Sequence, residues 1–299
     1  MATKWVRFTV SMSVVLLVTF FFCLGPSQNS QAVEGDEAES ALILGARKLE
    51  QGELDEAIAL LKKALALRPD LAKAHNNLGM AYLLKGSHDD AIVEFKLALQ
   101  LDPRDYSAHS NLGMAYLSKE DAKGAAEAFQ QAVKLRPDIA PLYVNLGQAY
   151  NAQQRYQDAI GVLLKGIDLD PSLVGAYYNL AFSYKELKRD REAEAVLKQA
   201  IHLNPEDWAA HNNLGILYIE IGRYDEALAM FQIVIQLNPD LPETYCKVGL
   251  VYERMREWAR SVPAYEQCLQ LTPETRKNQE LRMNLQEKLK KLKRTLSVF

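Results

Sequence analysis

Prolines recur along this chain at a spacing that does not vary. Seven of them lie 34 residues apart: Pro69, Pro103, Pro137, Pro171, Pro205, Pro239 and Pro273. A fixed period of this length is typical of proteins built from one supersecondary unit copied in tandem. When each proline is counted as position 32 of a unit, the chain divides into seven units: 38–71, 72–105, 106–139, 140–173, 174–207, 208–241 and 242–273.

Other positions of the unit fall into register with the prolines. Position 7 is Leu or Val, position 8 is Gly or Ala, position 11 is Tyr in the last six units, position 20 is Ala or Ser, and position 24 is Leu, Phe or Tyr. In the second unit, Leu78, Gly79 and Tyr82 share one helical face, and Ala91 and Phe95 share a face of a second helix. Because the small residues let two backbones approach and the large ones fill the volume beside them, each unit is predicted to form two helices.

Turn-forming residues separate the predicted helices. Gly52, Gly86 and Gly222 mark the turn between the two helices of a unit, where a left-handed conformation costs glycine little. The repeating proline ends the second helix, because it lacks an N–H group and its ring clashes with the preceding turn. An aspartate follows three of these prolines and is predicted to cap the next helix: Asp70, Asp138 and Asp240.

Residues 38–273, taken as seven such units, resemble the tetratricopeptide-repeat (TPR) family. The resemblance implies an all-α, right-handed superhelical solenoid of tandem helix-turn-helix repeats. One repeat cannot bury its apolar face alone, so stability comes from stacked neighbours and the open ends need covers. The first repeat departs from the family pattern at Ala41 and Lys48, where bulky residues are usual, and we expect it to be a loose terminal repeat.

The last segment, 274–299, is predicted to be a basic amphipathic helix that caps the seventh repeat. Its apolar residues are spaced three or four apart: Leu281, Leu285, Leu289, Leu292, Leu296 and Phe299. Its basic residues are expected to face water: Lys288, Lys290, Lys291, Lys293 and Arg294. The alternative is a basic amphipathic helix that lies on a membrane surface.

Residues 1–32 are predicted to be a secretory signal peptide or an N-terminal membrane anchor. Lys4 and Arg7 precede an apolar run over 8–24, and small residues up to Ala32 mark a cleavage site. In either case the positive charges stay inside and the acidic linker 33–37 follows on the far side, which places the repeats outside the cytoplasm. The protein is periplasmic or secreted if it is cleaved after Ala32, and otherwise membrane-anchored by residues 8–24.

Net charge and cysteine content narrow the function classes. The whole chain carries a net charge of -3, which gives no electrostatic reason to expect nucleic acid as a partner. Three cysteines are too few for a disulfide scaffold. Cys246 and Cys268 are therefore expected to be ordinary buried thiols, with a disulfide between them as the alternative.

The TPR resemblance implies that the first helix of each repeat lines a concave groove, with positions 2, 5, 6, 9 and 12 pointing inward. Position 6 is asparagine in five consecutive repeats: Asn77, Asn111, Asn145, Asn179 and Asn213. This ladder resembles the repeats of O-linked N-acetylglucosamine transferase, whose asparagines hold a peptide backbone. A carboxamide both donates and accepts hydrogen bonds, so it can pair with the backbone of any sequence. The alternative is that these asparagines only satisfy local backbone groups.

Residues near the ladder predict an apolar floor for a peptide with apolar anchors. The candidates are Met80, Met114, Gln148, Tyr178, Phe182 and Ile216. The charged clamp that the family uses for terminal carboxylates is missing, because the corresponding inward positions hold Asn76, Ser110 and Val144. We therefore do not expect binding to chaperone C-terminal tails.

No motif predicts catalysis, a cofactor or a metal. The sequence has no His-Glu-x-x-His, nucleophile elbow or Gly-rich phosphate loop. His75, His109 and His211 hold position 4 of separate repeats, too far apart to share one metal with bonds of about 2 Å, so core packing is favoured. The transferase has a catalytic domain after its repeats, but only 26 residues follow the repeats here, so that activity is not carried over.

These features together predict a non-enzymatic protein-protein interaction scaffold or assembly factor outside the cytoplasm. It would bind a peptide segment of a bacterial envelope protein in the concave groove. The alternative is a regulatory or adaptor subunit of an envelope enzyme such as a peptidoglycan hydrolase. The expected partners are proteins or peptides rather than nucleic acid, and membrane contact is expected only through the N-terminal segment.

Overall fold

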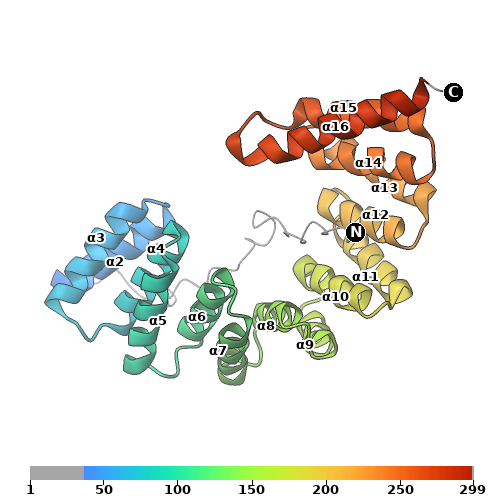
Figure 1. Cartoon of the computed structure of the whole chain (residues 1–299). Helices are drawn as coiled ribbons and strands as arrows, with labels where there is room; N and C mark the ends of the chain where they lie inside the picture. Colours follow the sequence, from blue (N-terminus) through green and yellow to red (C-terminus); the bar gives the residue numbers. More distant parts are fainter. Residues whose placement is uncertain (1–36, 298–299) are drawn as a thin grey trace. The chain divides into compact units, whose positions relative to one another are not determined.

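The computed structural model describes residues 37–297, and every regular element in that range is helical (Figure 1). The first helices of the repeats are α2 (Glu37–Glu50), α4 (Ala72–Lys85), α6 (Tyr106–Ser118), α8 (Ala140–Ala152), α10 (Val174–Glu186), α12 (Trp208–Glu220) and α14 (Pro242–Arg254). The second helices are α3 (Leu54–Leu67), α5 (His88–Leu101), α7 (Ala122–Leu135), α9 (Tyr156–Leu169), α11 (Asp190–Leu203), α13 (Tyr224–Leu237) and α15 (Trp258–Leu271). A short 3₁₀ turn (Arg276–Asn278) and α16 (Gln279–Leu296) follow.

The helices form two compact units, the first up to Asn179 and the second from Leu180, with the division inside α10. Within each unit, second helices pack against the first helix of the following repeat as well as against their own partner. This pattern confirms the predicted all-α solenoid of helix pairs. The signal peptide or anchor predicted for residues 1–32 lies outside the described residues.

The turn between paired helices needs one residue with positive φ. Gly52, Gly86 and Gly222 have φ values of 76°, 84° and 78°, which confirms the left-handed turns predicted at these glycines. The other four repeats place an ordinary side chain there, with φ near 60°: Glu120, Gln154, Lys188 and Arg256. An L-residue pays a conformational cost at such angles, so the repeat geometry overrides local preference at these four turns.

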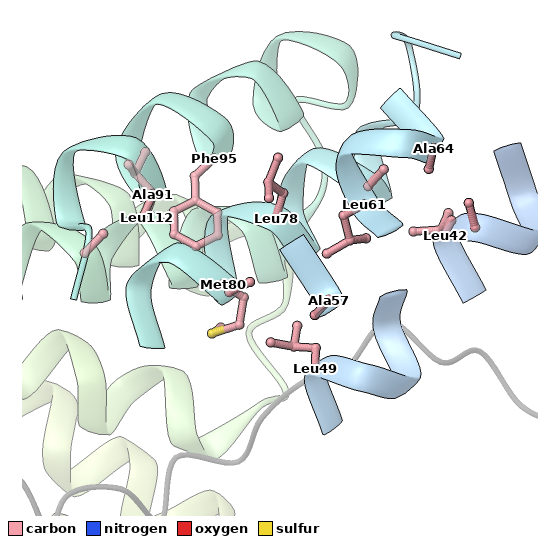
Figure 2. Packing of buried hydrophobic residues seen from close by; sticks show 14 of the residues in the cluster. Leu42, Leu49, Ala57, Leu61, Ala64, Leu78, Met80, Ala91, Phe95 and Leu112 are labelled. Atoms are coloured by element: carbon pink, nitrogen blue, oxygen red, sulfur yellow. The ribbon is translucent and has the colours of Figure 1, made fainter. Parts of the chain in front are cut away.

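In the six repeats with glycine at position 8, this glycine lies in close contact with the side chain at position 24. A Cβ atom added to Gly79 would lie 2.7 Å from the Phe95 ring, and one added to Gly113 would lie 2.7 Å from the Phe129 ring. Both phenylalanines are fully buried. Figure 2 shows Phe95 among the apolar side chains of the first unit's core. The phenylalanine ring therefore occupies the space that the absent side chain leaves free.

In the second to sixth repeats, the side chain at position 4 forms a hydrogen bond to the end of the preceding repeat. Nε2 of His75, His109 and His211 lies 3.0, 3.1 and 2.9 Å from the carbonyl oxygen of the proline six residues earlier. Tyr143 and Tyr177 donate from their hydroxyls to the corresponding proline carbonyl at 3.0 Å. These histidines therefore act in inter-repeat hydrogen bonding, which is more specific than the core packing we predicted.

The predicted helix caps were wrong. The residues that cap α4, α8 and α14 are Leu71, Ile139 and Leu241, and none of them makes a side-chain cap hydrogen bond. The carboxylates that do cap helices lie elsewhere: Asp105 before α6, Asp121 before α7 and Asp207 before α12. An aspartate directly after the proline lies one residue too early to reach the helix's first amides.

Helix α16 covers the last repeat as predicted. Leu285, Leu289 and Leu292 are buried in one cluster with Tyr265 of α15, and Leu296 packs at its edge. The predictions for the helix ends do not all hold. Leu281 is exposed, and Phe299 lies outside the described residues.

Two lysines of α16 do not simply face water. Lys288 Nζ lies 2.8 Å from the Glu253 carboxylate of α14, and Lys293 Nζ lies 2.6 Å from the Glu266 carboxylate of α15. The basic side chains therefore also fasten the cap to the seventh repeat, in addition to the apolar contacts.

The prediction of free thiols was wrong as well. Cys246 of α14 and Cys268 of α15 form a disulfide, with their Cα atoms 5.2 Å apart. Both cysteines belong to or pack against the cluster that α16 covers. The bridge therefore joins the two helices of the seventh repeat beneath the cap, and spacing along the sequence could not distinguish it from two buried thiols.

The cap provides a matched test within one helix. Leu289→Ala removes buried apolar volume and should lower the free energy of unfolding by roughly 2–4 kcal/mol, whereas Leu281→Ala changes an exposed side chain and should cost less than about 0.5 kcal/mol. Thermal or denaturant unfolding of both variants checks this. Equal effects of the two substitutions would contradict the capping role of α16.

A carboxylate network links two repeats of the second unit. Glu194 of α11 occupies a position that is apolar in most repeats, and it lies within 2.8 Å of Lys198 Nζ, the Tyr218 hydroxyl and Arg223 Nη1. Burial alone would raise the pKa of the Glu194 carboxyl, but hydrogen bonds from these three groups hold that pKa at about 2. The charged form of Glu194 is therefore stabilised in the folded protein.

This network predicts a pH-dependent contribution to stability. Because the pKa of Glu194 falls from 4.5 to about 2 on folding, its contribution is complete above pH 4.5 and is lost as the pH falls towards 2. Glu194→Gln should lower the free energy of unfolding by roughly 2–3 kcal/mol at pH 7, with the difference from wild type shrinking below pH 4.5. Unfolding curves across this pH range measure the difference, and the exposed Glu206→Gln serves as control. A difference independent of pH would contradict the assignment.

Candidate functional site

The first helices of the first unit form one continuous face. Consecutive first helices contact one another, α2 with α4, α4 with α6 and α6 with α8, and no contact of comparable extent joins consecutive second helices in the described part of that unit. Helices on the inside of a curved stack lie closer together than those outside. The first helices therefore form the inner side of the first unit, where the TPR resemblance placed the ligand.

The predicted asparagines lie on the first helices, each partly exposed. Their hydrogen bonding differs. Asn111 donates from Nδ2 to Asn76 Oδ1 at 3.0 Å, and Asn179 donates to the Gly175 carbonyl one turn earlier at 2.9 Å. The side chains of Asn77 and Asn145 have no hydrogen-bond partner among residues 37–297. Thus Asn179 satisfies a local backbone group, Asn111 bonds to a neighbouring side chain, and Asn77 and Asn145 keep their amides open.

Asn213 is the one member of the ladder in the second unit. It is half-buried on α12 and has no side-chain hydrogen-bond partner among the described residues. Its open amide makes it comparable with Asn77 and Asn145.

A buried polar chain supports the ladder and was not predicted. Asn76 donates from Nδ2 to Ser107 Oγ at 3.2 Å, and Ser107 donates to the Asp105 carboxylate at 2.6 Å. Together with the Asn111 bond, these contacts link α4 and α6 across the inner face. Polar residues at position 5 and position 2 of neighbouring repeats were the available signal, but only the stacking geometry shows that they meet.

The predicted apolar floor holds only in part. Met80 is 7% exposed and belongs to the core cluster of the first unit, so it offers little surface to a ligand (Figure 2). This is a correction, because Met80 packs within the core cluster that the first two repeats share. The remaining candidates are half-buried: Met114, Gln148, Tyr178, Phe182 and Ile216. In the second unit, Lys185 Nζ lies 5.4 Å above the Phe182 ring, so that ring carries a cation on one face.

Position 6 of the last repeat carries a lysine in place of asparagine. Lys247 of α14 is half-buried, and it forms no ion pair among residues 37–297. Burial lowers the pKa of its ammonium because the charge loses water, and the Glu243 carboxylate one turn earlier only partly offsets this effect. The sequence shows the substitution, but the desolvation appears only in the packed structure.

The described residues define what this face can do chemically. Residues 37–297 contain no group of three or more His, Cys, Asp or Glu side chains placed to hold a metal ion. Nor does that range include a helix with the length and apolar character needed to cross a membrane. What the inner face does offer is carboxamide donors and acceptors beside half-buried apolar side chains, a combination suited to a peptide backbone and its side chains.

Family comparisons agree with this architecture. Models described as TPR repeat or tetratricopeptide repeat match residues 45–86, 72–105, 110–173, 186–244 and 247–280. The chain therefore belongs to the tetratricopeptide-repeat family. Members of this family are generally non-catalytic scaffolds that bind protein partners. Among curated proteins, none matches the sequence significantly.

Solved structures show the same fold at low sequence identity. A tetratricopeptide repeat protein from Parabacteroides merdae is 20% identical, with a TM-score of 0.68 over 86% of this chain and 99% of that one. Pseudomonas aeruginosa pilF is 21% identical, with a TM-score of 0.57 over 73% and 99%. MamA from Desulfovibrio magneticus is 23% identical, with a TM-score of 0.54 over 58% and 99%. At these identities the likeness concerns the fold.

Replacing Lys247 is predicted to stabilise the protein, whereas most substitutions destabilise it. The Lys247 ammonium is desolvated and the Glu243 carboxylate offsets this only in part, so Lys247→Met should raise the free energy of unfolding by roughly 1 kcal/mol at pH 7. The penalty exists while the lysine is charged in the folded state, and it disappears as the pH rises towards the ordinary pKa of 10.5. Unfolding at pH 7 and pH 10.5 tests this, with the exposed Lys290→Met as control. A Lys247→Met variant that is clearly less stable at pH 7 would contradict the account.

Proposed function

We propose that this protein is a non-enzymatic scaffold outside the cytoplasm that binds a peptide segment of an envelope protein along the first helices of its repeats. The observation that carries the proposal is the set of open carboxamides at position 6. Asn77 and Asn145 present both a donor and an acceptor on the inner face of the first unit without partners there. An extended peptide has unpaired amides along its length, which such side chains can satisfy whatever its sequence.

The distribution of bonded and open asparagines supports a binding role over a purely structural one. If position 6 served only to satisfy local backbone groups, every asparagine would be expected to bond as Asn179 does with Gly175. Asn also has a poor helix propensity, so its occurrence without a local partner at Asn77 and Asn145 needs another explanation. A ligand that bonds to these amides provides one.

Two features support the location. Lys4 and Arg7 precede the apolar run 8–24, in the order typical of an export signal or anchor. The Cys246–Cys268 disulfide lies in the seventh repeat, and stable disulfides are typical of oxidising compartments such as the periplasm or the cell exterior. The second candidate function, an adaptor subunit of an envelope enzyme such as a peptidoglycan hydrolase, uses the same face and differs only in its partner.

The open and occupied asparagines provide matched variants. Asn77→Ala with Asn145→Ala should weaken binding of a peptide selected from a random-sequence library by roughly 10- to 100-fold, since each hydrogen bond contributes about 0.5–1.5 kcal/mol net. Asn111→Ala with Asn179→Ala should weaken binding less, because these side chains already donate within the protein. Peptide affinity and melting temperature are measured on the same samples. Equal loss in both pairs, or unchanged binding in the first pair with a normal melt, would argue against the ladder.

The proposed location has its own test. A reporter that is active only in an exported compartment, fused after residue 40, should be active, because Lys4 and Arg7 orient the following chain outward. Acid trapping and alkylation of the whole protein in cells should recover Cys246 and Cys268 as a disulfide. Reporter activity in the cytoplasm alone, or recovery of two free thiols, would contradict the location while leaving the peptide-binding test unaffected.

A further inference from the structure

The first repeat exposes a stacking position that the next five repeats bury. Leu44 holds position 7 of α2 and is 45% exposed, whereas Leu78 at the same position of α4 is 1% exposed. The next equivalents in the first unit, Leu112 and Leu146, are also buried. Beside Leu44, Ile43 is 53% exposed at the position where the next five repeats carry asparagine. Helix α2 therefore presents an apolar surface that elsewhere in the unit packs against the preceding repeat.

An exposed leucine is not by itself unusual in this protein. Leu101 at the end of α5 is 44% exposed, comparable with Leu44. The difference is the position, because position 7 is part of the inter-repeat contact and position 30, which Leu101 holds, lies at the end of the second helix. At the other end of the repeats, α16 covers the apolar surface of the seventh repeat, and its leucines are buried against α15. No described helix does the same for α2.

We infer that the exposed face of α2 binds the same face of a second copy of this chain, forming a two-fold symmetric pair. Continued stacking of α2 on the last repeat of another copy is blocked, because α16 already covers α15. An isologous contact is the remaining arrangement in which like surfaces meet and the assembly closes at two copies. This inference concerns assembly and does not depend on the proposed peptide binding.

Charges flanking Ile43 suit that arrangement. In two antiparallel copies of α2 with Ile43 at the two-fold axis, residue 39 of one copy faces residue 47 of the other. Those residues are Glu39 and Arg47, so each copy offers an acid and a base in complementary positions. Arg47 is exposed and has no ion-pair partner among residues 37–297, while Glu39 already lies 2.9 Å from Arg68 Nη2 of its own chain. The pairing therefore gives Arg47 a counterion and fixes the register.

The test is sedimentation equilibrium of the full-length chain, with the chain beginning at residue 33, which retains every helix described above, measured alongside. One helix pair buries less than the roughly 1,600 Å² of a standard interface, so we expect a dimer with a Kd on the order of 10 µM. Ile43→Glu should raise that Kd at least tenfold, and Leu101→Glu should leave it unchanged. Glu39→Arg and Arg47→Glu should each weaken the dimer, and the double exchange should restore it in part.

Melting curves of the same samples separate assembly from folding. A wild-type chain that stays monomeric at about 100 µM, tenfold above the expected Kd, overturns the inference. So does a dimer that Ile43→Glu leaves intact. If the full-length chain is monomeric and Ile43→Glu lowers its melting temperature, residues before 37 cover this face instead of a second copy, which also overturns the inference.

Discussion

The close approach of two helix backbones at a small residue is the constraint on which the rest of this structure depends. At Gly113 there is room for no side chain, because the Phe129 ring occupies that space. The ring thereby packs against both helices of its repeat and is fully buried. Once the pair is fixed at this distance, the next repeat can stack on it in the same way. The 34-residue period of the sequence follows from the repetition of that geometry.

Much of the architecture could be predicted because it follows from this contact and from stacking. The helix pairs, the glycine turns at Gly52, Gly86 and Gly222 and the burial of Leu285 and Leu289 all reflect local pattern. The departures arise where the outcome depends on how two helices pack against each other. Glu120 takes a glycine conformation because both flanking helices are already placed, and the Cys246–Cys268 bridge depends on how α14 meets α15.

The candidate site shows the same division between local and non-local information. Position 6 could be found from the sequence, but the asparagines there are not equivalent. Asn111 is drawn into the polar chain through Asn76 and Ser107, while Asn77 remains open. Met80 was expected at the inner surface, yet its side chain is buried in the core cluster of the first unit. The repeat positions thus indicate the face, and packing between repeats decides which side chains remain available on it.

A double-mutant cycle on the central contact tests the account most directly. Gly113→Ala should cost roughly 1–3 kcal/mol in the wild-type background, because the added methyl overlaps the Phe129 ring. In the Phe129→Ala background the ring is gone and alanine is the better helix former, so the same change should cost little or stabilise. The account predicts a coupling energy of at least about 1 kcal/mol from denaturant unfolding of the four proteins. Strictly additive effects would show that this contact does not set the spacing of the helix pair.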